Sequence, residues 1–173
     1  VAPVAPVFEN PVTLTNQNAY SLTVSGEADT TLRVYDGGEL LSEGGAFTTS
    51  LTLAEGLHHL AATLTDVVGN VSSASMLSIA VDQTAPAISG LPTVVSSVST
   101  GNITLSFNLA ELAPDGIDPS TALRDLALSV KINNQPMTAV GVEGAVYTYI
   151  YTVTNSDTQG LSTIEITATD AAG

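Results

Sequence analysis

Hydrophobic and polar residues alternate along most of this 173-residue chain with a period of two. Tyr20, Leu22 and Val24, for example, are separated by serine and threonine. Because successive side chains of an extended strand point to opposite faces, this alternation predicts half-buried β-strands rather than amphipathic helices. Further alternating runs fall at residues 47–53, 60–64, 103–109, 126–132 and 164–168.

Turn-forming pairs such as Gly37-Gly38, Gly44-Gly45 and Asn133-Asn134 separate these runs at short intervals. Many short strands divided in this way are typical of an all-β sandwich. The strands predicted for the first half are 11–15, 19–25, 31–36, 39–42, 46–53, 57–65 and 74–82. Those predicted for the second half are 87–91, 102–110, 125–132, 136–142, 145–154 and 162–169. Only residues 119–125 favour a short turn of helix.

The two halves divide near residues 82–86, where Pro86 interrupts the strand pattern. Proline removes a backbone donor and favours an extended conformation in the residue before it. An internal repeat supports the division, because the sequence at 62–69 recurs in altered form at 166–173. The predicted modules are residues 1–83, with an entry segment at 1–9, and residues 84–173.

The predicted second module has one strand fewer than the first and lacks its last strand. A sheet that lacks its last strand has an open edge, where another strand can pair. We expect this edge to stay open, or to be filled by a neighbouring molecule or by the entry segment, residues 1–9.

The composition excludes several classes of function. The chain has no cysteine, so it has neither disulfides nor a thiolate metal site. Its 17 acidic residues against 3 basic ones give a formal net charge of −14, which repels nucleic acids and anionic membranes. No apolar run is long enough to predict direct membrane insertion, and the first residues do not have the pattern of a signal peptide.

Three segments of the first module carry a family resemblance: residues 24–38, which begin Val-Ser-Gly-Glu-Ala-Asp, residues 56–72 and residues 79–86. Together they resemble the bacterial Ig-like repeats of giant secreted adhesins, including the RTX-type biofilm adhesins. The resemblance implies two tandem immunoglobulin-like β-sandwiches, an extracellular location at the cell surface and a structural spacer role. Neighbouring Ig-like repeats of the same chain would then be its partners, and the surface ligand is unknown.

Two features depart from a plain repeat of this family. Residues 111–124 are longer than such a repeat needs, and the last strand of the second module is absent. No glycine-rich nonapeptide repeats occur either. The resemblance therefore implies the middle of an adhesin rather than its secretion signal.

Selected carboxylates are expected to gather at the poles of the modules. In an Ig-like sandwich the N-terminus and alternate loops share one pole, and the C-terminus lies at the other. The carboxylates expected at the N-terminal pole of the first module are Glu27, Asp29 and Asp66, with Glu9 as a further candidate. Those expected at the junction of the modules are Asp82, Glu111 and Asp170, with Asp115 and Asp118 as further candidates.

Carboxylates that gather in this way repel one another unless a cation neutralises them. Calcium takes 6–8 oxygen ligands, whereas zinc prefers histidine or cysteine. We therefore predict Ca2+ at the junction, with carbonyl oxygens near Gln83 and Thr84, and the resemblance implies the same ion. In the alternative interpretation these aspartates cap turns, and the acidity only keeps the protein soluble.

Catalysis is not expected. His58 and His59 are adjacent on a predicted strand and face opposite ways, so they cannot chelate one metal. No Gly-x-Ser-x-Gly elbow occurs, and aromatic residues make up only 5% of the chain, with no tryptophan. Two other functions stay open: a glycan-binding adhesion module, and an accessory module of a secreted glycosidase. The first would use residues 111–124 and the tyrosines Tyr147, Tyr149 and Tyr151.

Overall fold

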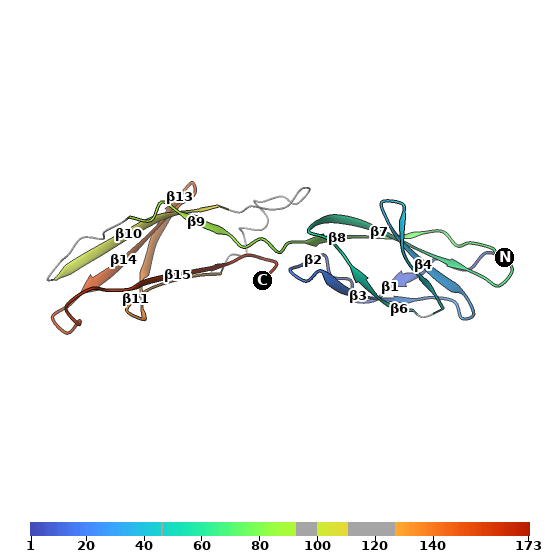
Figure 1. The fold of residues 1–173 in the computed structure, drawn as a ribbon, viewed down its shortest axis with the longest axis horizontal. Coiled ribbons are helices and arrows are strands. Elements are labelled where there is room, and N and C mark those ends of the chain that lie inside the picture. The colour runs from blue at the N-terminus through green and yellow to red at the C-terminus, as the bar shows by residue number, and fades with distance from the viewer. Residues whose placement is uncertain (46, 93–99, 111–126) are drawn as a thin grey trace. The chain divides into compact units, whose positions relative to one another are not determined.

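The computed structural model describes residues 1–45, 47–92, 100–110 and 127–173, and in these residues it contains strands and turns but no helix (Figure 1). The chain forms two compact units, the first from Val1 to Thr84 and the second made of the described residues from Ala85 to Ala171. No helix in the described ranges is long and apolar enough to cross a membrane. The residues predicted to form a helical turn, 119–125, lie outside the described part.

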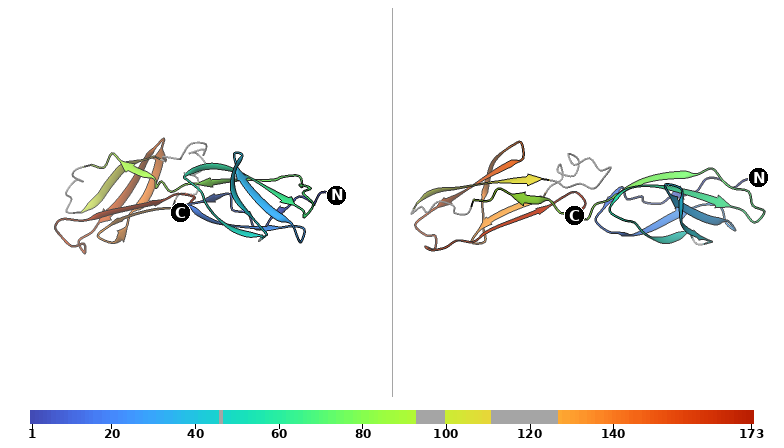
Figure 2. Two further views of the ribbon diagram at one scale, coloured as in Figure 1. Left: turned by 45° about the vertical axis from the view of Figure 1, so that its right-hand side comes forward. Right: turned by 45° about the horizontal axis from the view of Figure 1, so that its top comes forward.

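The first unit consists of two packed sheets (Figure 2). One has the strand order β1-β3-β6, formed by β1 (Val7–Phe8), β3 (Ala19–Ser25) and β6 (Thr48–Thr52). The other has the order β2-β8-β7-β4-β5, formed by β2 (Leu14–Thr15), β8 (Ser75–Val81), β7 (Gly56–Thr65), β4 (Thr31–Asp36) and β5 (Glu39–Gly44). All neighbours pair antiparallel except β2 and β8, which are parallel.

The core of the first unit lies between these sheets and follows the alternation of the sequence. In β3 the buried residues are Tyr20, Leu22 and Val24, and the residues between them are exposed. In β7 every second residue from Leu60 to Leu64 is fully buried. The inward positions predicted from the period of two are confirmed in both strands.

The second unit also consists of two sheets. One has the order β13-β14-β10-β9, formed by β13 (Thr138–Glu143), β14 (Val146–Val153), β10 (Gly101–Ala110) and β9 (Ala87–Ser89). The other has the order β12-β11-β15, formed by β12 (Gln135–Pro136), β11 (Ala127–Ile132) and β15 (Ile164–Thr169). Its core gathers around Leu105 and Phe107 of β10 and Val130 and Ile132 of β11. The expected class, an all-β fold of tandem sandwiches, is confirmed.

The open edge expected in the second unit lies beside β15. Within the described residues β15 pairs with β11 and with no other strand. The entry segment is not available to fill this edge, because Val7 and Phe8 pair with Ser25 and Val24 of the first unit. The alternative in which residues 1–9 complete the second sandwich is therefore wrong. Pro3 and Pro6, which are buried, hold that segment against its own unit.

The first unit has its chain entry and its chain exit at opposite poles. The entry strand β1 pairs with the last residues of β3, at Val24 and Ser25. The exit strand β8 ends at Val81, which pairs with Gly56 at the beginning of β7 and with Thr15 just before β3. Because β3 runs from one pole to the other, the polypeptide enters this sandwich at one end and leaves at the opposite end.

Candidate functional site

Asp66 caps the loop that follows β7. One oxygen, Oδ1, accepts the backbone N–H groups of Val68 and Asn70, and Oδ2 accepts the side-chain amide of Asn70 at 2.8 Å. The hydrogen bond from the Asn70 side chain, helped by those two backbone donors and opposed by burial, holds the pKa of Asp66 below its ordinary value. Both carboxylate oxygens are therefore already used to hold the turn Asp66–Gly69 closed, in the manner of an Asx turn.

Glu27 and Asp29 lie in the turn between β3 and β4 and also have local structural roles. Glu27 accepts the backbone N–H of Val4 with its side chain, and its carbonyl oxygen accepts the hydroxyl of Thr30 at 2.6 Å. Asp29 has a positive φ of 57°, a left-handed conformation that aspartate tolerates better than most residues. The contacts of Glu27 tie the entry segment to this turn.

The structure does not gather the three carboxylates predicted for the first unit. Among the described residues no group of three or more acidic or histidine side chains is placed to hold a metal ion. The carboxylates of Glu27 and Asp66 have hydrogen-bond partners of their own on separate segments. A calcium site made of Glu27, Asp29 and Asp66 stays a prediction from the sequence.

The residues predicted for the junction are described only in part. Asp82 follows β8 and is 1% exposed, and its Oδ1 accepts the N–H of Thr84 at 3.1 Å. Asp170 follows β15 directly and is half-buried. Glu111, like Asp115 and Asp118, lies outside the described residues. Asp82 is thus a nearly fully buried carboxylate at the exit of the first unit, which is uncommon for aspartate.

The tyrosines proposed as a sugar-binding surface pack toward the core instead. Tyr147, Tyr149 and Tyr151 are half-buried and contact the buried cluster of the second unit. The ring of Phe107 stacks with Tyr147 and Tyr149, with centroids 6.1 and 6.0 Å apart. The hydroxyl of Tyr151 donates to Asp157 at 2.6 Å. A sugar-binding surface of this kind requires aromatic rings on a flat exposed face. These contacts instead pack the three rings against the core of the second unit.

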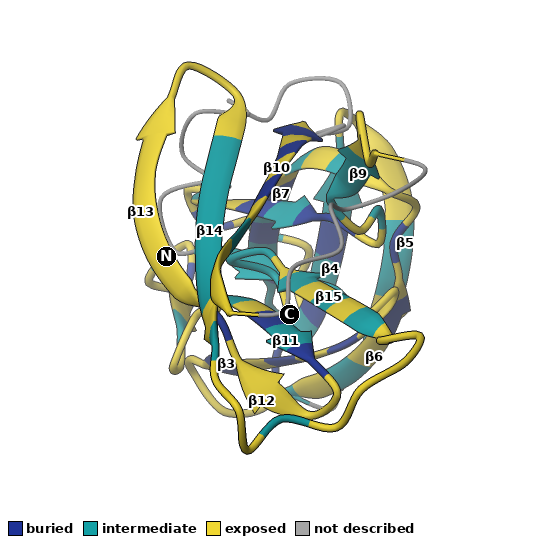
Figure 3. Cartoon of the chain, turned by 90° about the vertical axis from the view of Figure 1, so that its left-hand side faces the viewer, coloured by how far each residue is buried: buried dark blue, intermediate teal, exposed yellow. Residues whose placement is uncertain are grey.

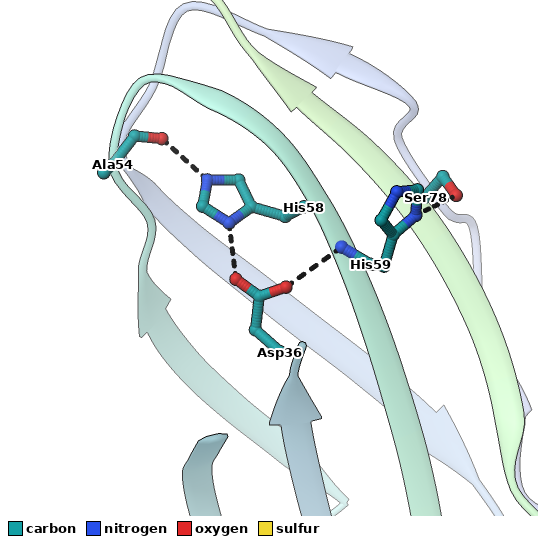
Figure 4. Close-up of polar contacts among 5 residues, drawn as sticks. All are labelled: Asp36, Ala54, His58, His59 and Ser78. Carbon is teal, nitrogen blue, oxygen red and sulfur yellow. Dashed lines mark hydrogen bonds and ion pairs between the residues drawn. The ribbon is translucent and has the colours of Figure 1, made fainter. Parts of the chain in front are cut away.

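A polar cluster that the sequence did not suggest joins β4 to β7 (Figure 4). His58 Nδ1 lies 2.6 Å from Asp36 Oδ2, and His58 Nε2 lies 2.8 Å from the carbonyl oxygen of Ala54. Asp36 Oδ1 accepts the backbone N–H of His59, whose own ring contacts Ser78 on the other side of the strand. The two histidines therefore point apart, as predicted.

The surroundings of the His58 ring favour its charged form. Burial lowers the pKa of His58, but the hydrogen bonds to Asp36 and to the Ala54 carbonyl, together with the charge of Asp36, outweigh burial and raise it above its ordinary value. Both partners are acceptors, so only an imidazolium can donate to both of them at once. When the ring is protonated, His58 and Asp36 form an ion pair that joins β7 to β4.

Comparison with known proteins gives one family match. Residues 10–83 match the family model described as the bacterial Ig-like domain. This match supports a bacterial Ig-like repeat in the first unit. No curated protein matches the chain.

Several solved structures are similar to this chain. The fibronectin(III)-like modules of CbhA from Clostridium thermocellum are 16% identical, with a TM-score of 0.51 over 96% of this chain and 86% of that one. The D00-D0 domain of intimin is 12% identical, with a TM-score of 0.39 over 97% and 93%. The chitinase ChiA74 from Bacillus thuringiensis is 16% identical, with a TM-score of 0.37, and the chain spans 27% of its length. Because the sequence identity is only 16%, the similarity to the CbhA modules shows the fold alone.

Replacing Asp66 with alanine is expected to loosen its loop equally with and without calcium. The side chain closes the turn by accepting local donors, so its loss should speed amide hydrogen exchange at Val68 and Asn70. Exchange measured in calcium and again in a chelator would show the same increase. An increase seen only in calcium would instead make Asp66 a ligand of the ion.

Proposed function

We propose that this chain is a non-catalytic spacer of an extracellular surface protein, built from consecutive Ig-like sandwiches. The observation that carries the proposal is the path of the chain through the first unit, which enters at one pole and leaves at the other. A module with this path separates whatever precedes it from whatever follows it. Its neighbours in the same polypeptide are then its natural partners.

The dimensions of the strands support a spacer. β7 contains 10 residues, and a strand of that length spans roughly 33 Å at about 3.3 Å per residue. Each such module therefore adds a few tens of ångströms of length with fewer than a hundred residues. The packing of the tyrosines into the second unit also favours a spacer over a glycan-binding module.

Calcium would stiffen the spacer in this proposal. The ion would be held by Asp82, Glu111 and Asp170, with carbonyl oxygens near Gln83 and Thr84. Asp82 supports an oxygen-only site because its carboxylate is buried at the exit of the first unit, and Asp170 directly follows β15, the last described strand of the second. Extracellular modules bind calcium with dissociation constants of roughly 10⁻⁴–10⁻³ M, so such a site would be filled outside the cell and empty in the cytosol.

Solution scattering of the chain with calcium and with a chelator tests the stiffening. We expect the distribution of interatomic distances to broaden when calcium is removed, while each sandwich stays folded because its core does not use the ion. Asp170→Ala should reproduce the effect of the chelator. Asp157→Ala is the matched control, since among the described residues the Asp157 side chain accepts hydrogen bonds from Thr154 and from the hydroxyl of Tyr151.

Two results would separate the parts of this proposal. Equal distance distributions with and without calcium would remove the stiffening role and leave the spacer intact. Binding of the chain to a glycan array, lost when Tyr149 is replaced by alanine, would make it a ligand-binding module instead. A catalytic domain in the flanking sequence of the parent protein would assign the pair of modules to a secreted glycosidase.

A further inference from the structure

Two asparagines of the chain stand in the motif Asn-x-Ser/Thr, in which x is not proline. One motif is Asn70-Val71-Ser72, in the loop after β7, and the other is Asn102-Ile103-Thr104, at the beginning of β10. This motif is the acceptor for N-linked sugars, which are attached to the asparagine amide at the protein surface. The fold places the two motifs in different surroundings and so separates them chemically.

The first motif is used to close the loop after β7. The side-chain amide of Asn70 donates to Asp66 Oδ2 at 2.8 Å, so the nitrogen that would receive a sugar is already held in the loop. Ser72 is 8% exposed, and its hydroxyl accepts the backbone N–H of Leu64 and donates to the carbonyl oxygen of Ser73. Transfer of a sugar to Asn70 therefore requires this loop to open first.

The second motif is open to solvent. Asn102 and Thr104 are both exposed, and residues two apart in a strand point to the same face of the sheet. Figure 3 shows this alternation between exposed and buried residues along β10. Asn102 Oδ1 accepts the hydroxyl of Thr152 at 2.9 Å, a bond that engages the oxygen of the side chain and not the nitrogen that receives the sugar. The acceptor amide and the hydroxyl that the motif requires thus share one accessible face.

The sheet face around Asn102 also suits a neutral sugar. β10 and its neighbour β14 contain no acidic or basic residue, although the chain has a formal net charge of −14. Their outward side chains are mostly hydroxyls and amides, as in the pair of Ser106 and Thr148, whose hydroxyl oxygens lie 3.1 Å apart. A neutral sugar can hydrogen-bond to such a face without removing a charged group from water.

We propose that Asn102 is a site of N-glycosylation that carries a neutral hexose, and that Asn70 stays unmodified. The donor is a sugar activated by a diphosphate group, and a separate glycosyltransferase catalyses the transfer. The bond between sugar C1 and the phosphate oxygen breaks, the phosphate leaves with the electron pair, and C1 bonds to Asn102 Nδ2. The amide nitrogen loses one proton to a base of the enzyme. The proposal does not depend on calcium or on the spacer role.

Peptide mass spectrometry of the parent protein, purified from the cells that make it, tests the site. Cleavage before aspartate releases residues 66–81 and 82–114 as separate peptides, one for each motif. We expect a hexose on the peptide 82–114 and none on the peptide 66–81. A peptide 82–114 found entirely without sugar, or a sugar found on 66–81, would overturn the proposal.

Enzymatic transfer to the purified chain provides a second measurement. With a soluble N-glycosyltransferase and UDP-glucose, Asn102 should be modified about tenfold faster than Asn70 or more, because the loop at Asn70 must open first. Thr104→Ala should abolish transfer to Asn102. Ser106→Ala, exposed on the same face but outside the motif, is the matched control and should leave transfer unchanged. Equal rates at Asn70 and Asn102 would show that the fold does not select between the motifs and would also contradict the proposal.

Discussion

Replacing Leu60 with alanine is expected to lower the free energy of unfolding of the first unit by about 2–5 kcal/mol. Leu60 is fully buried in β7, which lies between β4 and β8. Its neighbours belong to strands paired on both sides, so they can close only part of the cavity that the smaller side chain leaves. A urea titration followed by resolved amide resonances of each unit would measure the loss.

The matched substitution in the second unit is Ile164→Ala. Ile164 stands at the same position of the internal repeat but is only half-buried. The smaller loss of buried apolar area should make this change clearly less costly than Leu60→Ala. Val67→Ala, at a site that is 87% exposed, should change stability by no more than about 0.5 kcal/mol. Equal losses at Leu60 and Ile164 would show that both strands are enclosed to the same degree.

The strands were predictable because a period of two is a direct consequence of burying one face of a sheet. The predicted runs 19–25 and 31–36 coincide with β3 and β4, and 102–110 is one residue shorter than β10. The short strands β1 and β12 were not predicted as separate elements. Each is a two-residue ladder that exists only because its partner strand is already in place, so its own sequence carries no pattern.

The carboxylates were harder to interpret than the strands. The order and direction of the strands are enough to predict that Glu27 and Asp66 belong to the same pole. The position of a carboxylate does not show whether its oxygens bind a cation or accept hydrogen bonds from nearby backbone N–H groups. In Asp66 the local donors occupy both oxygens, and the sequence Asp66-Val67-Val68-Gly69, an aspartate followed by a glycine three residues later, was the signal for such a turn.

The ion pair of His58 and Asp36 could not be predicted without the register between β4 and β7. Asp36 lies opposite Leu60, which puts it diagonally across from His58 on the same face of the sheet. Alternation fixes which face a side chain occupies but not which residue of the next strand it meets. For this reason the sequence separated His58 from His59 correctly and still gave no indication of the partner of His58.

That ion pair should make the stability of the first unit fall as the pH rises. Folding raises the pKa of His58 above the value of about 6.5 expected in the unfolded chain. Stabilisation from a raised pKa is complete below the unfolded value and is lost as the pH passes through the folded one. The urea midpoint of the first unit should therefore decrease from about pH 6.5 upward. The second unit contains neither of the two histidines and provides an internal reference in the same sample.

Asp36→Ala tests the cause of this pH dependence. Without the carboxylate, the His58 ring and the backbone N–H of His59 lose their acceptor, and the first unit should lose about 1–3 kcal/mol below pH 6.5. Most of the slope with pH should disappear as well, because the group that stabilises the imidazolium is gone. His59→Asn is the matched control: its ring contacts only the hydroxyl of Ser78, which can donate or accept, so the slope should persist. If the pH dependence of stability persists in Asp36→Ala but disappears in His59→Asn, it arises from His59 and not from His58. That result would refute the role of the ion pair.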